Sequence, residues 1–194
     1  MSSVPDSTAP TSIIDRIARY VWPALVIAGL AIVGSSQATW GYSEDGAQVQ
    51  VSGLGGVNAR AAATADVEAA FADHTQRPGL LTLALGAVIF VVAVVAWWKP
   101  IRRNRGAVFV AAAVIAAAGV GTAVAAVTVV SDPAASLFDD AVTGALDLPG
   151  PILQPGWGLL ATVVVGVLTV VFALAAAVLR WWTDSAGKAE RAHQ

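Results

Sequence analysis

Apolar residues fall into four long blocks, and none of these blocks contains a charged side chain. A helix rises about 1.5 Å per residue, so about 20 apolar residues cross the roughly 30 Å hydrocarbon core of a membrane. Three blocks reach that length by themselves, and the first reaches it when residues 34–40 are counted with it. The pattern therefore predicts four membrane-spanning helices, at about 20–40, 80–98, 107–130 and 157–180.

Polar segments between and beyond the blocks complete the expected organisation. Residues 1–12 are rich in Pro, Ser and Thr, which predicts a disordered tail. We expect an all-α membrane protein, in which a four-helix transmembrane bundle over 13–182 carries two long, partly structured loops. The two long loops, the short loop and the C-terminal tail are expected at 41–79, 131–156, 99–106 and 183–194.

Charged residues are sorted along the chain, and this sorting predicts the orientation. The two long loops hold nine acidic residues against two basic ones, whereas the other polar segments hold nine basic against four acidic. Segments rich in Lys and Arg stay on the cytoplasmic side of a membrane. We therefore expect a multi-pass protein of the cell (cytoplasmic) membrane with both termini and the 99–106 loop in the cytoplasm, and the long loops outside.

Tryptophans and basic residues gather where the apolar blocks end, as in "AWWKPIRRNRG". Indole rings favour the headgroup region, and Lys and Arg favour the anionic inner surface. The predicted cytoplasmic basic loop contains Lys99, Arg102, Arg103 and Arg105. The predicted interfacial anchors are Trp22, Trp40, Trp97, Trp98, Trp157, Trp181 and Trp182. A cage for a quinone or another aromatic ligand is the alternative interpretation of these rings.

The long loops carry local patterns of their own. Val49 and Val51 alternate with polar residues before the Gly-rich "GLGG", which predicts a short strand or hairpin arm. Residues 63–74 predict a short helix on the membrane surface. Asp132 followed by Pro133 predicts the start of another helix. Its apolar face would contain Leu137, Phe138, Val142 and Leu146.

The first helix is also compatible with a signal peptide. Arg16 and Arg19 precede a short apolar run, and small residues stand where cleavage after Ala38 would require them. We favour an uncleaved helix, because the whole stretch that leads up to Ala38 is long and Trp40 suits an outer anchor. The sequence leaves cleavage after Ala38 open.

Small residues recur along one side of the third block. Their spacing of four puts them on one helix face, and small residues let helices approach closely in lipid. The stripe consists of Ala113, Ala117, Gly121 and Ala125. It predicts either packing inside the bundle or a face for another membrane protein.

The second and fourth blocks echo each other. Each begins with Pro-Gly, continues with Leu-Leu followed by a threonine, and ends with Trp-Trp. The echo predicts two helical hairpins in parallel repeat, and chance similarity between simple Ala/Val/Leu helices is the alternative.

Residues that could support catalysis or bind a metal are scarce. The chain has no cysteine, and the four apolar blocks hold no ionisable side chain, although ion pumps and proton-coupled carriers usually keep one there. His74 and its neighbouring carboxylates lack a recognised ligand spacing. We therefore expect no enzyme, no catalytic, cofactor-binding or metal-binding residue, no cofactor and no nucleic-acid partner.

The order of parts resembles a family of small actinobacterial tetraspan proteins, the tryptophan-operon-associated transmembrane proteins. The resemblance lies in the Arg residues before the first helix, "SSQATW" at its far end, "VSGLGGV", the basic loop and Trp157 at the start of the fourth helix. The chain departs from the family in its longer first outer loop and in its "RWWTDSAGKAERAHQ" tail. The resemblance implies a tetraspan fold and no known activity, so it assigns no functional residue.

Composition and pattern together favour a non-catalytic role. The chain is 57% hydrophobic and 12% charged, with a mean hydropathy of +0.71, so lipid is its expected solvent. We expect an accessory or scaffolding subunit of a larger respiratory or cell-envelope complex, in contact with membrane lipids and other integral membrane subunits. An envelope enzyme using carboxylates of the outer loops, with Asp139 and Asp140 as the acids that would favour it, is a further hypothesis. The main alternative is a homo-oligomeric pore or uncoupled transporter lined by Thr122, Thr128, Thr162 and Thr169.

Overall fold

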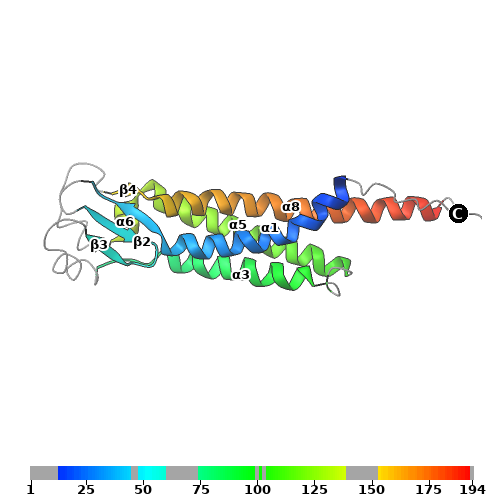
Figure 1. Cartoon of the computed structure of the whole chain (residues 1–194), viewed down its shortest axis with the longest axis horizontal. Helices are drawn as coiled ribbons and strands as arrows, with labels where there is room; N and C mark the ends of the chain where they lie inside the picture. The colour runs from blue at the N-terminus through cyan, green and yellow to red at the C-terminus, as the bar shows by residue number, and fades with distance from the viewer. Residues whose placement is uncertain are drawn as a thin grey trace, which may run out of the picture.

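Four long helices dominate the computed structural model, which describes residues 13–44, 48–59, 74–98, 101, 104–138 and 153–192 (Figure 1). The helices are α1 (Ile13–Gln37), α3 (Gly79–Trp97), α5 (Arg105–Ser131) and α8 (Trp157–Ala192). Each contains a stretch long and apolar enough to cross a membrane. The four predicted helices are thus confirmed, and α8 continues twelve residues past its predicted end at 180.

The helices form a ring in which each contacts two neighbours. α1 and α5 each pack against both α3 and α8. Figure 1 shows the strands gathered at one end of the bundle and α8 extending beyond the other helices at the opposite end. We call these the sheet end and the tail end.

Glycines bring the helices together at two equivalent crossings. A Cβ on Gly29 of α1 would lie 3.0 Å from the carbonyl oxygen of Gly86 in α3. A Cβ on Gly119 of α5 would lie 3.1 Å from the carbonyl oxygen of Gly166 in α8. Such close backbone approach is how helices associate in lipid. The matching positions support the predicted repeat of two hairpins.

The bundle interior is apolar and closely packed. Leu25, Ile89 and Ile115 are fully buried in one cluster with alanines from α3, α5 and α8. On the outside, Val110 and Leu174 are more than half exposed, at 65% and 57%. Large apolar side chains on the outer surface fit contact with lipid, where their exposure carries no hydrophobic cost.

Both long loops contribute to one antiparallel sheet at the sheet end. The strand order is β3-β2-β1-β4. The strands are β1 (Thr39–Tyr42), β2 (Val49–Ser52), β3 (Val57–Ala59) and β4 (Gln154–Pro155). The strand predicted at Val49 and Val51 is confirmed as β2. We call this sheet the head. The all-α expectation holds for the bundle and not for the head, because segments of both long loops pair there through their backbones.

A short helix and a bridge add to the contact between the two loops. α6 (Pro133–Leu137) begins as predicted, with Asp132 accepting a hydrogen bond from the Ala135 backbone nitrogen at 3.1 Å. Thr75 and Phe138 form an isolated antiparallel bridge. The helix predicted over 63–74 lies, except for His74, outside the described residues, as do Val142 and Leu146.

Candidate functional site

Two serines at the end of α1 link three helices through their hydroxyls. Ser35 Oγ lies 2.8 Å from Thr162 Oγ1 of α8, and Ser36 Oγ lies 2.8 Å from Thr82 Oγ1 of α3. All four side chains are buried. A hydroxyl has one proton, so in each pair one hydroxyl donates to the other helix and its partner is free to donate to a carbonyl of its own helix.

We expect Ser36→Ala to destabilise the protein by only about 0.6 kcal/mol, and by at most about 1.7 kcal/mol. The loss is modest because Thr82 can still donate to the carbonyl oxygen of Gly79, at 3.0 Å. A double-mutant cycle with Thr82→Ala, measured by unfolding in mixed detergent micelles, gives the coupling energy. The control is Ser131→Ala, since Ser131 is exposed and its hydroxyl donates to the carbonyl oxygen of Val127 in its own helix. Additive effects of the two substitutions would contradict the link.

Trp40 fills the joint between the bundle and the sheet. Its side chain is 0% exposed, and its Nε1 donates to the carbonyl oxygen of Ser35 at 2.9 Å. It belongs to a cluster with Val51 and Leu159. A Cβ on Gly53 would lie 2.6 Å from the ring, so only glycine fits beside it.

The Pro-Gly starts of α3 and α8 are the points where these helices join the sheet. The Gly79 backbone nitrogen donates to the carbonyl oxygen of Gly53 at 2.8 Å, and that of Gly156 donates to the carbonyl oxygen of Trp40 at 2.7 Å. A Cβ on Gly79 would lie 2.5 Å from Gly53 backbone atoms, and one on Gly156 would overlap the carbonyl oxygen of Thr39. The sheet is therefore held directly on the bundle by its backbone.

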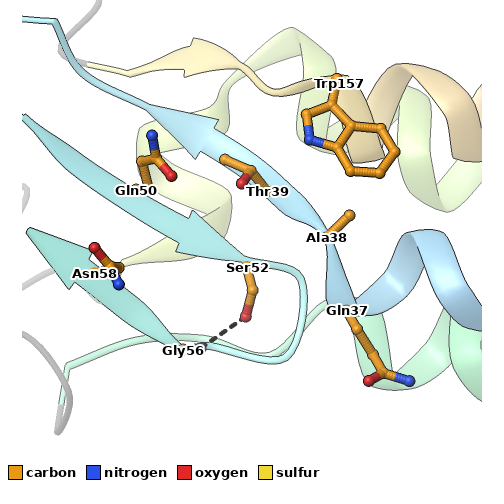
Figure 2. A pocket seen from close by; sticks show the side chains of 8 residues that line it. All are labelled: Gln37, Ala38, Thr39, Gln50, Ser52, Gly56, Asn58 and Trp157. Atoms are coloured by element: carbon orange, nitrogen blue, oxygen red, sulfur yellow. Dashed lines mark hydrogen bonds between the residues drawn. The ribbon is translucent and has the colours of Figure 1, made fainter.

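An open groove lies beside this joint, between one face of the sheet and the ends of α1 and α8 (Figure 2). Its volume is about 360 Å³, and among the residues that the structure describes no ionisable side chain lines it. Five lining side chains are neutral and polar, and Ser52 Oγ accepts a hydrogen bond from the Gly56 backbone nitrogen at 2.9 Å. The groove is lined by Gln37, Ala38, Thr39, Gln50, Ser52, Gly56, Asn58 and Trp157.

The threonines proposed to line a pore are not brought together on one open surface. Thr122, Thr162 and Thr169 are fully buried in the protein. Thr122 and Thr169 donate to carbonyl oxygens of their own helices, at 2.9 and 2.8 Å. Only Thr128 is exposed among the four. Three of the four threonines proposed as pore lining are therefore buried within the protomer.

The small-residue stripe of α5 faces mainly outward. Ala113 and Ala117 are exposed, and Gly121 and Ala125 are partly exposed. The buried face of α5 instead uses a neighbouring row that includes Ala118, Thr122 and Ala126.

The seven tryptophans divide into two groups. Five rings are exposed, and their predicted anchoring in a membrane interface stays a prediction: Trp97, Trp98, Trp157, Trp181 and Trp182. Trp22 and Trp40 are 5% and 0% exposed, so the structure does not place them on the lipid-facing surface. Trp22 packs in the bundle core and Trp40 in the joint between the bundle and the sheet.

Charged candidates are described only in part. Arg105 is exposed at the first turn of α5, whereas Lys99, Arg102 and Arg103 lie outside the described residues, as do Asp139 and Asp140. His74 is exposed. Within the described part of the chain, no group of three or more metal-ligating side chains comes together.

Sequence reasoning named Trp157 as an interfacial anchor and did not predict a groove beside it, although one further signal was available. The alternation of Val49 and Val51 places Gln50 and Ser52 on the opposite face of the same strand. Their neighbour Trp157 belongs to the fourth helix, so its proximity depends on how the sheet joins the bundle. A scan of protein-family models and a search of curated proteins found no match to the chain.

Proposed function

We propose that this protein is a non-catalytic subunit of the cytoplasmic membrane that acts as an accessory or scaffold in a larger respiratory or cell-envelope complex. The observation that carries the proposal is the outward direction of the α5 stripe. Ala113 and Ala117 are exposed, while the bundle completes its own packing with Ala118 and Ala126. The outward stripe is therefore left for a helix from another membrane protein.

The closed interior supports a non-catalytic role. The hydroxyls of Thr122 and Thr169 are satisfied by their own helix backbones, so they are not poised to bind a substrate. A homo-oligomeric pore has less support, because only Thr128 of the proposed lining is exposed. The resemblance to the tryptophan-operon-associated family adds no activity to this proposal.

In the proposed orientation the sheet lies outside the cell, and both termini lie in the cytoplasm. The end of α3, the start of α5 and the C-terminal part of α8 lie at the tail end of the bundle. Arg105 and Arg180 belong to that end, and the acidic Glu44 belongs to the sheet end. Arg77 also lies at the sheet end, beside Gly55, so the described charges follow the positive-inside rule with this one basic exception.

The proposal is tested by extracting the native protein in a mild detergent, followed by native electrophoresis and mass spectrometry of the band. Co-migration with other subunits in a fixed ratio would support it. A lone monomer or homo-oligomer would contradict it, and flux assays in liposomes would then test the pore.

We expect Ala117→Leu to reduce recovery of the co-migrating subunits at least tenfold, which corresponds to about 1.4 kcal/mol of association free energy. A larger side chain would hold the partner helix away from the α5 backbone. The measurement is the same native gel, with thermal unfolding to verify the fold. Val91→Leu on the exposed outer face of α3 is the matched control. Equal loss in both variants would count against a specific α5 contact.

A further inference from the structure

The groove at the sheet end carries an inference that is independent of the partner complex. Its volume of about 360 Å³ lies within the usual range for small-molecule sites, about 300–1,000 Å³. Three carboxamides reach it from separate elements, Gln37 from α1, Gln50 from β2 and Asn58 from β3. Figure 2 shows them spread around the groove with Ser52 between them.

The polar groups of the groove are suited to hydroxyl groups. Each carboxamide offers two donor hydrogens and one acceptor oxygen, and among the described residues these three have no hydrogen-bond partner. The Ser52 hydroxyl already accepts a bond from Gly56, so its own proton remains available to a ligand. The described residues of this lining offer an anion or a cation no opposite charge, whereas a polyhydroxylated ligand matches their mixed donors and acceptors.

Trp157 supplies an apolar wall and places the groove relative to the membrane. It is the first residue of α8, it lines the groove, and it is 67% exposed. Its flat ring can stack on the C–H face of a sugar ring while the carboxamides bind the hydroxyls. The residue also marks one end of a membrane-length helix, and exposed tryptophans at such ends lie at headgroup level.

We propose that the groove binds an uncharged sugar or polyol group at the membrane surface, with the headgroup of a glycolipid as its source. Gln37 and Trp157, at the helix ends, contact the part of the headgroup nearest the bilayer. Gln50, Ser52 and Asn58, on the sheet, contact the part that extends into water. A soluble saccharide has the same chemistry and is the second source to be distinguished.

The test uses the full-length protein in phosphatidylcholine nanodiscs that contain a diglucosyl diacylglycerol with the same acyl chains. Native mass spectrometry of the protein released from the discs gives the ratio of bound glycolipid to bound phosphatidylcholine. We expect the glycolipid to be enriched over its fraction in the disc. An equal fraction of anionic phosphatidylglycerol should not be enriched.

Two variants in the groove connect the enrichment to these side chains. Gln50→Leu with Asn58→Leu removes the hydrogen-bonding groups at nearly constant volume, and Trp157→Ala removes the stacking surface. We expect each to reduce glycolipid enrichment about tenfold. Gln154→Leu is the matched control, because Gln154 is an exposed carboxamide on β4 that does not line the groove. Thermal unfolding verifies that each variant folds, and Trp157→Ala alone keeps the test decisive if the double variant does not.

A calorimetric titration with the deacylated headgroup, diglucosyl glycerol, distinguishes the two sources. Enrichment of the glycolipid that is lost in the groove variants, with no binding of the free headgroup, supports the proposal. Binding of the free headgroup as strong as binding of the glycolipid would overturn the lipid source and assign a soluble saccharide. Enrichment that survives both groove variants, or no enrichment and no binding at all, would overturn the site.

Discussion

Replacing Trp40 with alanine is expected to destabilise the protein by about 3–5 kcal/mol, the range for truncating a large buried aromatic residue. The side chain is fully buried and belongs to the cluster that joins the sheet to the bundle. Gly53 packs directly against the Trp40 ring. Because glycine has no side chain, Gly53 cannot fill the cavity that truncation of Trp40 would leave. The loss should be seen in the head and in the packing of the sheet end of α1.

The measurement is the free energy of unfolding in mixed micelles with increasing denaturing detergent. Trp40→Phe keeps an aromatic ring and leaves the carbonyl oxygen of Ser35 without its indole donor, so a smaller loss of about 1–3 kcal/mol is expected. Trp157→Ala is the matched control, because that ring is 67% exposed. Comparable losses at positions 40 and 157 would refute the structural role assigned to Trp40.

Gly156→Ala is the second substitution expected to have a large effect, with a loss of about 3 kcal/mol, at the upper end of the usual range for overpacking. The new methyl group would overlap the carbonyl oxygen of Thr39 and approach the Trp40 backbone at 3.1 Å. These are backbone atoms, which cannot move aside as a flexible side chain can. The hydrogen bond from the Gly156 nitrogen to Trp40 would lengthen or break.

Gly34→Ala provides the opposite expectation within α1. A Cβ at Gly34 would meet nothing within 4 Å, so the substitution should stabilise the helix by about 0.5–1 kcal/mol. Thermal unfolding of both variants in the same detergent compares them. A destabilised Gly34→Ala, or a Gly156→Ala as stable as the parent, would show that the close approaches at the sheet end do not decide stability.

The helices could be predicted because each apolar block is long and free of charge, which is the pattern of a helix able to span a membrane. The sheet could not be predicted in full, because β1 and β4 have four and two residues, too few to show an alternating pattern. Their pairing depends on where α1 and α8 end relative to each other. Only β2, with Val49 and Val51, carried a pattern of its own.

The roles of Trp40 and of the α5 stripe show a related limit. A tryptophan at the end of an apolar block looks the same in sequence whether lipid or protein surrounds its ring. The burial of Trp40 depends on its contact with Gly53, which the sequence pattern does not show. On α5, two rows of small residues run side by side. The crossing of Gly119 with Gly166 determines which row faces inward, and spacing along one helix cannot reveal its partner.

The strand order has a consequence for how the protein is made. β1 lies between β2, which follows it closely in the chain, and β4, which comes immediately before the last helix. Since synthesis proceeds from the N-terminus, one side of the β1 strand stays unpaired until β4 has been made, after the first three long helices. The strand that then closes the sheet also brings Gly156 onto the Trp40 backbone. A complete sheet thus requires that the chain has been made through α1, α3 and α5 as far as β4.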